Sequence, residues 1–350
     1  MGTQLRAAGS WGRKRQTRRD GQGIFMLLVT GGAGFLGSNL IAQLNESGRS
    51  DIVVNDTLGL GNKWRNLGKR RLADVVPAGE LMRWLDKRRL DAVFHLGAIS
   101  DTTACDGDLV LEINFRLSLR LLDWCTVTRT PFIYASSAAT YGDGQYFDDN
   151  WTPAALARLR PMNLYGFSKH LFDLAIVDRF AKGSKLPPQW AGLKFFNVFG
   201  PNEYHKGEMM SLVAKRFDEA KDGQPVRLFK SHRSGIADGE QKRDFIYVDD
   251  AVAVMCWLLA TPSVSGIFNV GTGCARSFRD LITAVFVALG RAPHIEYIDM
   301  PLSIRNQYQY FTQAKIENLR RAGYNAGFTP LEPAVDCYVN SFLNQRDRYR

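Results

Sequence analysis

Three polar residues in the middle of the chain have the types and spacing needed for proton transfer. Tyr165 and Lys169 are four residues apart, so in a helix both side chains lie on one face. Ser137 follows the apolar, strand-like run 132–135, and open α/β sheets bind ligands at the carboxyl ends of their strands. Tyrosine has a pKa of about 10 and is a poor base at neutral pH, but a close ammonium favours its phenolate. Tyr165 could then accept a proton from a hydroxyl whose oxygen is hydrogen-bonded to Ser137.

A glycine-rich segment near the amino terminus is the second chemical signature. Residues 31–37 read Gly-Gly-Ala-Gly-Phe-Leu-Gly, after the apolar run 26–30 and before a helical pattern over 35–45. Glycines in a strand-to-helix turn let the backbone approach a pyrophosphate, whose charge is bound by free N–H groups at the helix start. This placement favours a dinucleotide-binding turn over an ordinary glycine-rich loop.

The residues after the next strand bear on which dinucleotide binds. Asp56 ends that strand nineteen residues after Gly37, where an acid commonly binds the adenosine ribose hydroxyls and favours NAD. Lys63, followed by the basic run 69–71, could instead neutralise the 2′-phosphate of NADP, or lie in a solvated loop. We expect NADP, with NAD as the alternative.

A bound nicotinamide would extend the chemistry open to the tyrosine. Its cationic ring favours the phenolate of Tyr165 and can accept hydride from the carbon whose hydroxyl is deprotonated. The combination predicts oxidation of an alcohol. The alternative is that the turn, Ser137 and the Tyr165–Lys169 pair are separate structural features.

The segments that must position these groups alternate between strand and helix patterns. Strand-like runs at 51–55, 92–96, 132–135 and 192–196 are separated by helical patterns at 80–89, 108–126 and 164–180; further elements are expected at 249–259, 267–270 and 278–289. This alternation predicts an α/β protein with a Rossmann-type doubly wound parallel sheet and a smaller C-terminal α/β substrate lobe. We assign 26–196 to the dinucleotide-binding domain and 197–350 mainly to the substrate lobe, with the chain recrossing around 245–275.

Composition excludes several classes of protein. The 350 residues, 45% hydrophobic and 23% charged, can form a full core, and no apolar run reaches the roughly 18 residues of a membrane span. The five cysteines are scattered without C-x-x-C spacing, so we expect no disulfide framework and no metal site. A reducing, cytoplasmic location is expected.

The basic charge is concentrated at the amino terminus. Residues 1–25 contain six Arg or Lys and one Asp, which is half of the net charge of +10. We expect a flexible extension outside the fold, with Met26 as the physiological start and without membrane or nucleic-acid binding. A nucleic-acid patch or a transit peptide is the alternative.

Motifs along the chain resemble the extended short-chain dehydrogenase/reductase family, and within it the ADP-L-glycero-D-manno-heptose 6-epimerases. His-Lys-Gly at 205–207 and Phe-Thr-Gln-Ala at 311–314 are the discriminating motifs, supported by 29–39, 134–142, 195–201, 243–248 and 266–273. The resemblance implies inversion at C6 of ADP-D-glycero-D-manno-heptose by transient oxidation and re-reduction with bound NADP, for the lipopolysaccharide inner core. It also implies a homo-oligomer, a pentamer.

The resemblance further implies roles for individual residues. Tyr165 and Lys206 would be acid–base groups on alternate faces of the sugar, supported by Lys169 and Ser137, because hydride return to the opposite face needs a proton donor there too. The implied coenzyme-binding residues are Gly31, Gly34, Phe35, Leu36, Gly37, Asp56, Thr57, Lys63, Leu96, Gly97, Ala98, Ser100, Asn114, Lys169, Val198 and Lys206. The implied substrate-binding residues are Ser137, Asn197, Glu208, Lys215, Phe229, Arg243 and Tyr308. Lys206 could instead be an exposed lysine in a turn.

The chain departs from the family pattern at a few positions. We associate a serine and a histidine with the positions of Glu208 and Lys215, and a second phosphate-directed lysine with that of Ala78. The loop at 231–241 is longer than expected and should reshape the nucleotide-diphosphate pocket.

Three other functions are compatible with parts of this pattern. A nucleotide-sugar 4-epimerase would share Tyr165, Lys169 and Ser137 but has no need of Lys206. A dehydratase typically has an acid pair where this chain has Ala138 and Ala139. A non-catalytic dinucleotide- or nucleic-acid-binding protein would have no use for the Tyr–Lys–Ser set.

Overall fold

The computed structural model describes residues 26–142, 147–305 and 308–350. The predicted basic extension at 1–25 lies outside these ranges. Within them, no helix combines the length and the apolar character needed to cross a membrane.

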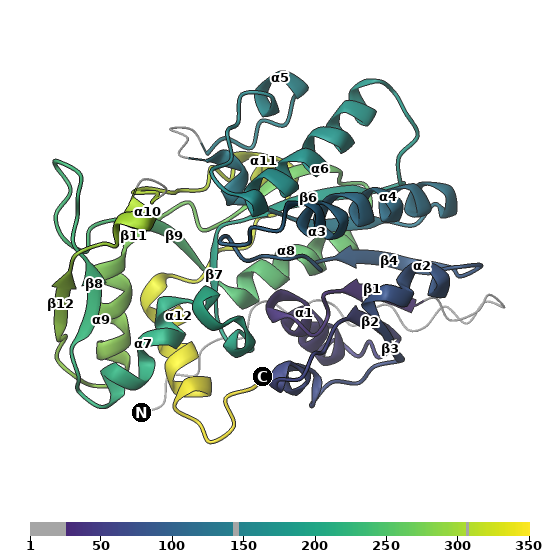
Figure 1. Ribbon diagram of the computed structural model, residues 1–350. Coiled ribbons are helices and arrows are strands. Elements are labelled where there is room, and N and C mark those ends of the chain that lie inside the picture. Colours follow the sequence, from purple (N-terminus) through teal and green to yellow (C-terminus); the bar gives the residue numbers. More distant parts are fainter. Residues whose placement is uncertain (1–25, 143–146, 306–307) are drawn as a thin grey trace.

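A seven-stranded sheet forms the larger lobe (Figure 1). Its strand order is β10-β6-β5-β4-β1-β2-β3, and all neighbouring strands are parallel. The winding reverses between β1 and β4, which is where doubly wound sheets bind ligands. The predicted Rossmann-type fold is therefore confirmed. The strands are β1 (Met26–Thr30), β2 (Ile52–Asp56), β3 (Asp74–Pro77), β4 (Leu90–His95), β5 (Phe132–Ser137), β6 (Trp190–Phe195) and β10 (Gly266–Val270).

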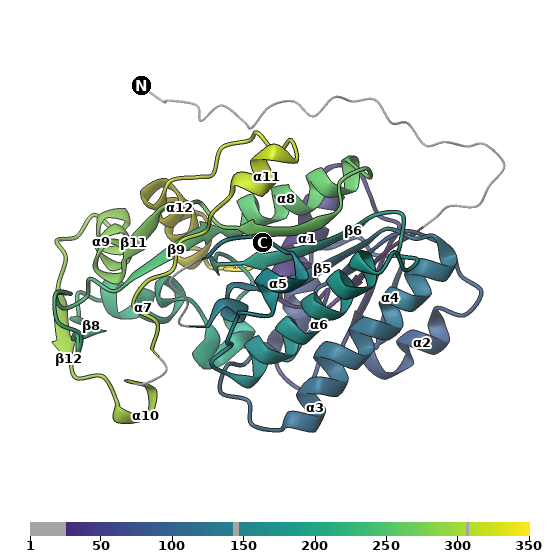
Figure 2. The same cartoon turned by 90° about the horizontal axis from the view of Figure 1, so that it is seen from above.

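Helices cover both faces of this sheet because successive residues of a strand point to opposite sides. Leu27 and Val29 of β1 pack in one apolar cluster with residues of α1 (Phe35–Glu46) and α8 (Val248–Ala260). Leu28 packs in a second cluster with residues of α4 (Leu117–Thr128) and α6 (Leu164–Ala181). Figure 2 shows these two helix layers on opposite sides of the sheet.

The smaller lobe lies beside the large sheet and is built from segments beyond residue 196 (Figure 1). It contains a three-stranded sheet, β11-β9-β7, and a two-stranded parallel sheet, β12-β8. The chain returns to the large sheet through α8 and β10. The elements are β7 (Asn197–Phe199), α7 (Leu212–Lys221), β8 (Val226–Phe229), β9 (Lys242–Tyr247), β11 (Ala275–Ser277), α9 (Phe278–Ala288), β12 (Ile295–Ile298) and α12 (Leu331–Tyr338).

Short helical segments complete the described chain. They are η1 (Asn62–Leu67), η2 (Ala78–Glu80), α2 (Leu81–Trp84), α3 (Gly107–Leu111), the π-helical η3 (Glu112–Arg116), η4 (Ala138–Tyr141), α5 (Pro153–Leu156), η5 (Tyr204–Met209), α10 (Leu302–Arg305), α11 (Glu317–Arg321) and the π-helical η6 (Val339–Leu343).

Three segments differ from the sequence-based expectation. The predicted helix at 80–89 is wrong over most of its length, because α2 ends at Trp84 and Lys87 has a left-handed φ of 56°. The predicted helix at 108–126 is interrupted by the π-helical segment η3. In η3 the side chain of Asn114 bonds to the backbone of Ile99, in the loop after β4. The edge strand β3 was not predicted, since only Val76 of its four residues is buried and no apolar run marks it.

Candidate active site

The turn between β1 and α1 can be built only with glycine at two of its positions. Gly31 has a φ of 66°, and a Cβ there would lie 2.6 Å from the backbone N and Cα of Gly97. A Cβ on Gly37 would lie 2.3 Å from the carbonyl oxygen of Gly31. Within the described chain no side chain caps α1 at Gly34, so its first N–H groups are free for an anion. The turn, which also carries Phe35 and Leu36, fits a dinucleotide pyrophosphate.

The carboxylate of Asp56 borders this turn at the end of β2. Its Oδ2 accepts from the Ala33 N–H at 2.9 Å, and its Oδ1 accepts from the Thr57 N–H at 2.7 Å and from the Lys63 ammonium at 2.6 Å. The Asp56 side chain is 8% exposed and that of Lys63 is 24% exposed. Lys63 therefore partly neutralises the Asp56 carboxylate, whose negative charge would otherwise repel the 2′-phosphate of NADP.

The loop after β4 lies against the turn on the other side of β1. Leu96 N–H donates to the Thr30 carbonyl at 3.1 Å, and Gly97 N–H to the Thr30 hydroxyl at 3.2 Å. Asn114 exchanges two hydrogen bonds of 2.9 Å with the backbone of Ile99, which places η3 beside this loop. The structure thus brings together the predicted coenzyme residues Leu96, Gly97, Ala98, Ser100 and Asn114 at the β1–β4 reversal.

Ser137 meets Tyr165 because η4 packs directly on the first turn of α6. A Cβ on Gly166 would lie 2.6 Å from the carbonyl oxygen of Ala139, so a larger residue would hold the two segments apart. Asn163 caps α6 by accepting from the Gly166 N–H at 2.8 Å. Ser137 Oγ accepts from the Ala139 N–H at 3.1 Å, which leaves its own hydroxyl proton available to Tyr165.

The protein groups shift the pKa values of Tyr165 and Lys169 in opposite directions. Burial raises the pKa of Tyr165, a hydrogen bond with Ser137 lowers it, and the charge of Asp173 raises it. Burial lowers the pKa of Lys169 to about 8, and Asp173 opposes this change. The expected lowering of the phenol pKa is therefore not a property of the chain alone, because burial outweighs the favourable contacts.

Lys206 lies against the start of α1. Its side chain is 23% exposed, which differs from the alternative that it is an exposed lysine in a turn. Its ammonium lies 5.0 Å from the centroid of the Phe35 ring and 4.0 Å from Oε2 of the buried Glu203. Burial lowers the pKa of Lys206, whereas Glu203 raises it. Lys206 also lines a cavity of about 290 Å³ together with two other predicted residues, Asn197 and Val198.

Three predicted substrate residues form an aromatic cluster in the smaller lobe. Arg243 is buried, and its guanidinium lies 5.3 Å from the centroid of Tyr308 and 5.5 Å from that of Phe278. Tyr308 packs edge-to-face on Phe229, with centroids 6.3 Å apart. Contact with two aromatic rings restricts the orientation of the planar guanidinium, which suits recognition of a diphosphate.

A polar link connects this cluster to the segment that carries Ser137. Arg243 donates to the carbonyl of Gln309, and the side-chain amide of Gln309 donates to the carbonyl of Gly142, just after η4. The long loop at 231–241 lies nearby, since His232 N–H donates to the Tyr310 hydroxyl at 3.0 Å. Its effect on the pocket stays a prediction.

Glu208 and Lys215 are paired with each other. Lys215 Nζ lies 2.5 Å from Glu208 Oε2, and the side chains are 22% and 90% exposed, respectively. Neither is joined by these contacts to the groups above, so their contact with substrate stays a prediction.

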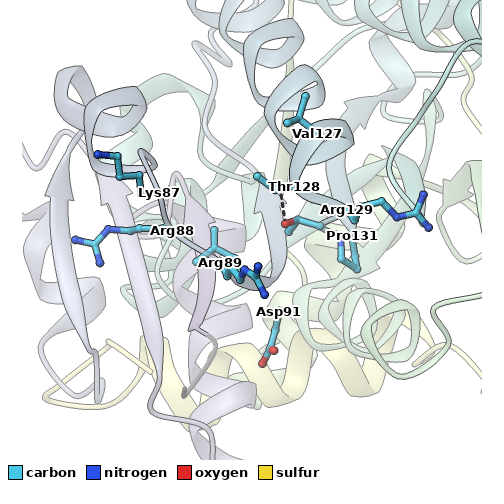
Figure 3. Close-up of a pocket in the computed structure, with 10 residues that line it drawn as sticks. Lys87, Arg88, Arg89, Asp91, Val127, Thr128, Arg129 and Pro131 are labelled. Carbon is cyan, nitrogen blue, oxygen red and sulfur yellow. Dashed lines mark hydrogen bonds between the residues drawn. The ribbon is translucent and has the colours of Figure 1, made fainter. Parts of the chain in front are cut away.

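A second cavity, of about 740 Å³, lies at the amino-terminal ends of strands β4 and β5, away from the glycine-rich turn (Figure 3). Lys87, Arg88, Arg89 and Arg129 contribute to its lining. In Figure 3 these basic side chains point in different directions. The guanidinium carbon of Arg88 lies 4.3 Å from the centroid of the Trp84 ring. The basic side chains do not converge on one ligand position, and we assign no site there.

Three features of the site were not predicted from the sequence: Gly166, Glu203, and a buried ion pair between Asp173 and Lys194. One local signal indicates that Lys194 has a buried partner, without naming that partner: Lys194 interrupts the apolar run at 192–196. A charge inside such a run requires a buried partner.

Comparisons with known proteins show which family the chain resembles over its length. A model of the NAD dependent epimerase/dehydratase family matches residues 27–271. The chain is 49% identical over 331 residues to an ADP-L-glycero-D-manno-heptose-6-epimerase of Nitratidesulfovibrio vulgaris (strain DP4), which covers 93% of this chain and 100% of that protein. A solved ADP-L-glycero-D-manno-heptose-6-epimerase from Helicobacter pylori is similar with a TM-score of 0.75 and 30% identity, over 91% of this chain and 96% of that one. A UDP-glucose 4-epimerase from Thermus thermophilus, solved with NAD, has a TM-score of 0.67 and 26% identity, over 91% of this chain and 100% of that one.

Proposed function

This chain belongs to the NAD dependent epimerase/dehydratase family, and we propose that it is the isomerase that inverts C6 of ADP-D-glycero-D-manno-heptose to give ADP-L-glycero-D-manno-heptose. Near full-length similarity, at 49% identity, to a relative named for this reaction carries the proposal. The packing of Ser137 on the Tyr165 helix supports it, because it joins the groups that oxidation of a sugar hydroxyl requires.

The coenzyme proposed is NADP, with NAD as the alternative. The turn at Gly31 and Gly37 leaves no room for a Cβ, which fits close approach of a dinucleotide, and Asp56 and Lys63 lie where the adenosine ribose is expected. When bound, the coenzyme supplies the hydride acceptor and donor.

The residues of the chain supply the protons and the alignment. Tyr165 takes the proton of the C6 hydroxyl while Ser137 is hydrogen-bonded to the same oxygen, and the Lys169 ammonium stabilises the phenolate. After the sugar turns to present its other face, a second group must return a proton to the ketone oxygen. We assign that step to Lys206, which lies against the start of α1 and lines the cavity.

The substrate is tested directly by separating epimers after incubation with ADP-D-glycero-D-manno-heptose or with UDP-galactose. We expect conversion of the heptose at C6 and none of the galactose at C4. Conversion of UDP-galactose alone would reassign the protein as a 4-epimerase, and conversion of neither would reject both functions.

Lys63→Ala tests the coenzyme preference. We expect the Kd for NADP to rise roughly 10- to 100-fold, the loss of a charge-assisted hydrogen bond, while the Kd for NAD changes little. Titration of protein fluorescence with each coenzyme measures both constants. Lys87→Ala, just before β4 and away from the glycine-rich turn, is the matched control. Equal loss of affinity for NAD and NADP would remove the 2′-phosphate role of Lys63.

The wider setting of the enzyme is proposed from the resemblance to ADP-L-glycero-D-manno-heptose 6-epimerases. We propose a nucleotide-sugar substrate for lipopolysaccharide biosynthesis, a cytoplasmic location, and a homo-oligomer, a pentamer. The division of the chain at residue 196, with residues 1–25 as a separate extension, is proposed on the sequence pattern.

A further inference from the structure

A buried ion pair lies directly behind the proposed proton-transfer groups. Lys194 Nζ is 2.7 Å from Asp173 Oδ2, and the two side chains are 1% and 0% exposed. Removing two charges from water is costly, and an apolar pair of similar size is often at least as stable. Stability alone therefore does not explain this pair.

The remaining bonds of the pair are also satisfied. Asp173 Oδ1 accepts from the Tyr134 hydroxyl at 2.9 Å, and Oδ2 accepts from the Ser136 hydroxyl at 2.7 Å. Lys194 donates to the Thr140 hydroxyl at 2.6 Å. A buried polar network whose members are all paired holds a single arrangement of its segments.

The segments that it joins are those that carry the proton-transfer groups. Asp173 lies on α6, one turn after Lys169 and two turns after Tyr165. Thr140 belongs to η4, and its hydroxyl donates to the Ser137 carbonyl at 2.8 Å. A continuous path of hydrogen bonds therefore runs from α6, through Lys194 of β6 and Thr140, to Ser137.

We propose that the Asp173–Lys194–Thr140 network is a positioning device for epimerisation: it sets Ser137 against the Tyr165 face of α6 and keeps a negative charge beside Lys169. These three are positioning residues, since they act through Ser137 and Lys169 and not on the sugar. The inference rests on the proposed function.

The charges around Lys169 give the network a signature in pH. Burial lowers the pKa of Lys169 to about 8, and the Asp173 carboxylate opposes that change. His95 of β4 is close enough for the charge of Lys169 to act on it; burial and that charge lower the pKa of His95 to about 3, so its ring is neutral. The other nearby cation, Lys194, is paired with Asp173. The ammonium of Lys169 is the active form, so activity falls as pH rises through its pKa. Loss of Asp173 lowers that pKa further and moves the alkaline limb of kcat to lower pH.

The link to Ser137 is tested by Thr140→Val, which leaves both charges paired. We expect kcat for ADP-heptose epimerisation to fall roughly 10- to 100-fold, the effect of a small misplacement, with an unchanged Kd for NADP. Thr140→Ser keeps the hydroxyl and should retain kcat within about twofold of the wild type. A structural role alone would lower the Tm of Thr140→Val without this difference in kcat between Val and Ser.

The charge is tested by the double variant Asp173→Asn with Lys194→Met, which removes both buried charges and avoids leaving one unpaired. We expect a folded protein, shown by a cooperative thermal transition, with reduced kcat and an alkaline limb at lower pH. Asp178→Asn, an exposed carboxylate on the same helix, is the matched control.

The outcomes separate this inference from the proposed function. Inactivity of the wild type on ADP-heptose would reject the function. An active wild type whose folded Thr140→Val and double variants keep its kcat and pH profile would reject the positioning role.

Discussion

Tyr165→Phe is expected to lower kcat for C6 epimerisation by a factor of about 10²–10⁴, because it removes the group that exchanges a proton with the sugar hydroxyl. The substitution deletes one hydroxyl oxygen from a partly buried ring and should leave the fold and the Kd for NADP unchanged. Epimers separated after timed incubation measure kcat, and fluorescence titration measures coenzyme binding.

A buried tyrosine outside the candidate active site provides the control. Tyr324 is buried and packs on Trp257, near the carboxyl end of α8, with ring centroids 5.4 Å apart. Tyr324→Phe should retain wild-type kcat. If Tyr165→Phe also keeps most of its activity, the assignment of the phenol as the base is wrong.

Lys206→Met distinguishes one base from two in the same assay. If a second proton donor serves the other face of the ketone, this variant should lose epimerisation, as Tyr165→Phe does. Each variant retains one base, so dismutation of an aldehyde analogue, which needs no inversion at a carbon, should survive in at least one of them. Full epimerase activity in Lys206→Met would reject the two-base mechanism.

Gly37→Ala is expected to raise the Kd for NADP roughly 100-fold or more, since it displaces the N–H groups that bind the pyrophosphate. The new Cβ would lie 2.3 Å from the Gly31 carbonyl oxygen and 2.7 Å from the Gly32 Cα. The turn has little room to move away, because Gly31 N–H donates to the Asn55 carbonyl at 2.8 Å and its Cα faces Gly97. The overpacking should also lower the free energy of unfolding by about 1–3 kcal/mol.

Coenzyme titration and thermal denaturation measure these two effects. Gly107→Ala is the matched control, since a Cβ there meets no atom within 4 Å and Gly107 lies in α3. That variant should bind NADP with wild-type affinity. Unchanged NADP binding in Gly37→Ala would show that the turn is not the pyrophosphate site.

The doubly wound fold was predictable because each βα unit carries its own apolar pattern. The failures occurred where that pattern is weak. Strand β3 lies at the edge of the sheet and has only one buried residue. The helix predicted at 80–89 was too long, because nothing in the apolar spacing indicates the left-handed conformation of Lys87. In the smaller lobe, short strands such as β7 and β11, three residues each, are too brief to show a period.

The predictable parts of the site are those formed by near neighbours along the chain. Gly31 and Gly37 belong to a single turn, and Tyr165 and Lys169 share one helical face, so their geometry follows from neighbours along the chain. Three other features depend on how distant segments fold together: the contact of Ser137 with Tyr165, the burial of Lys206 beside Phe35, and the Asp173–Lys194 pair. Their partners lie 21 or more residues apart and meet only through the strand order and the close packing of η4 on α6, which no local pattern of side chains records.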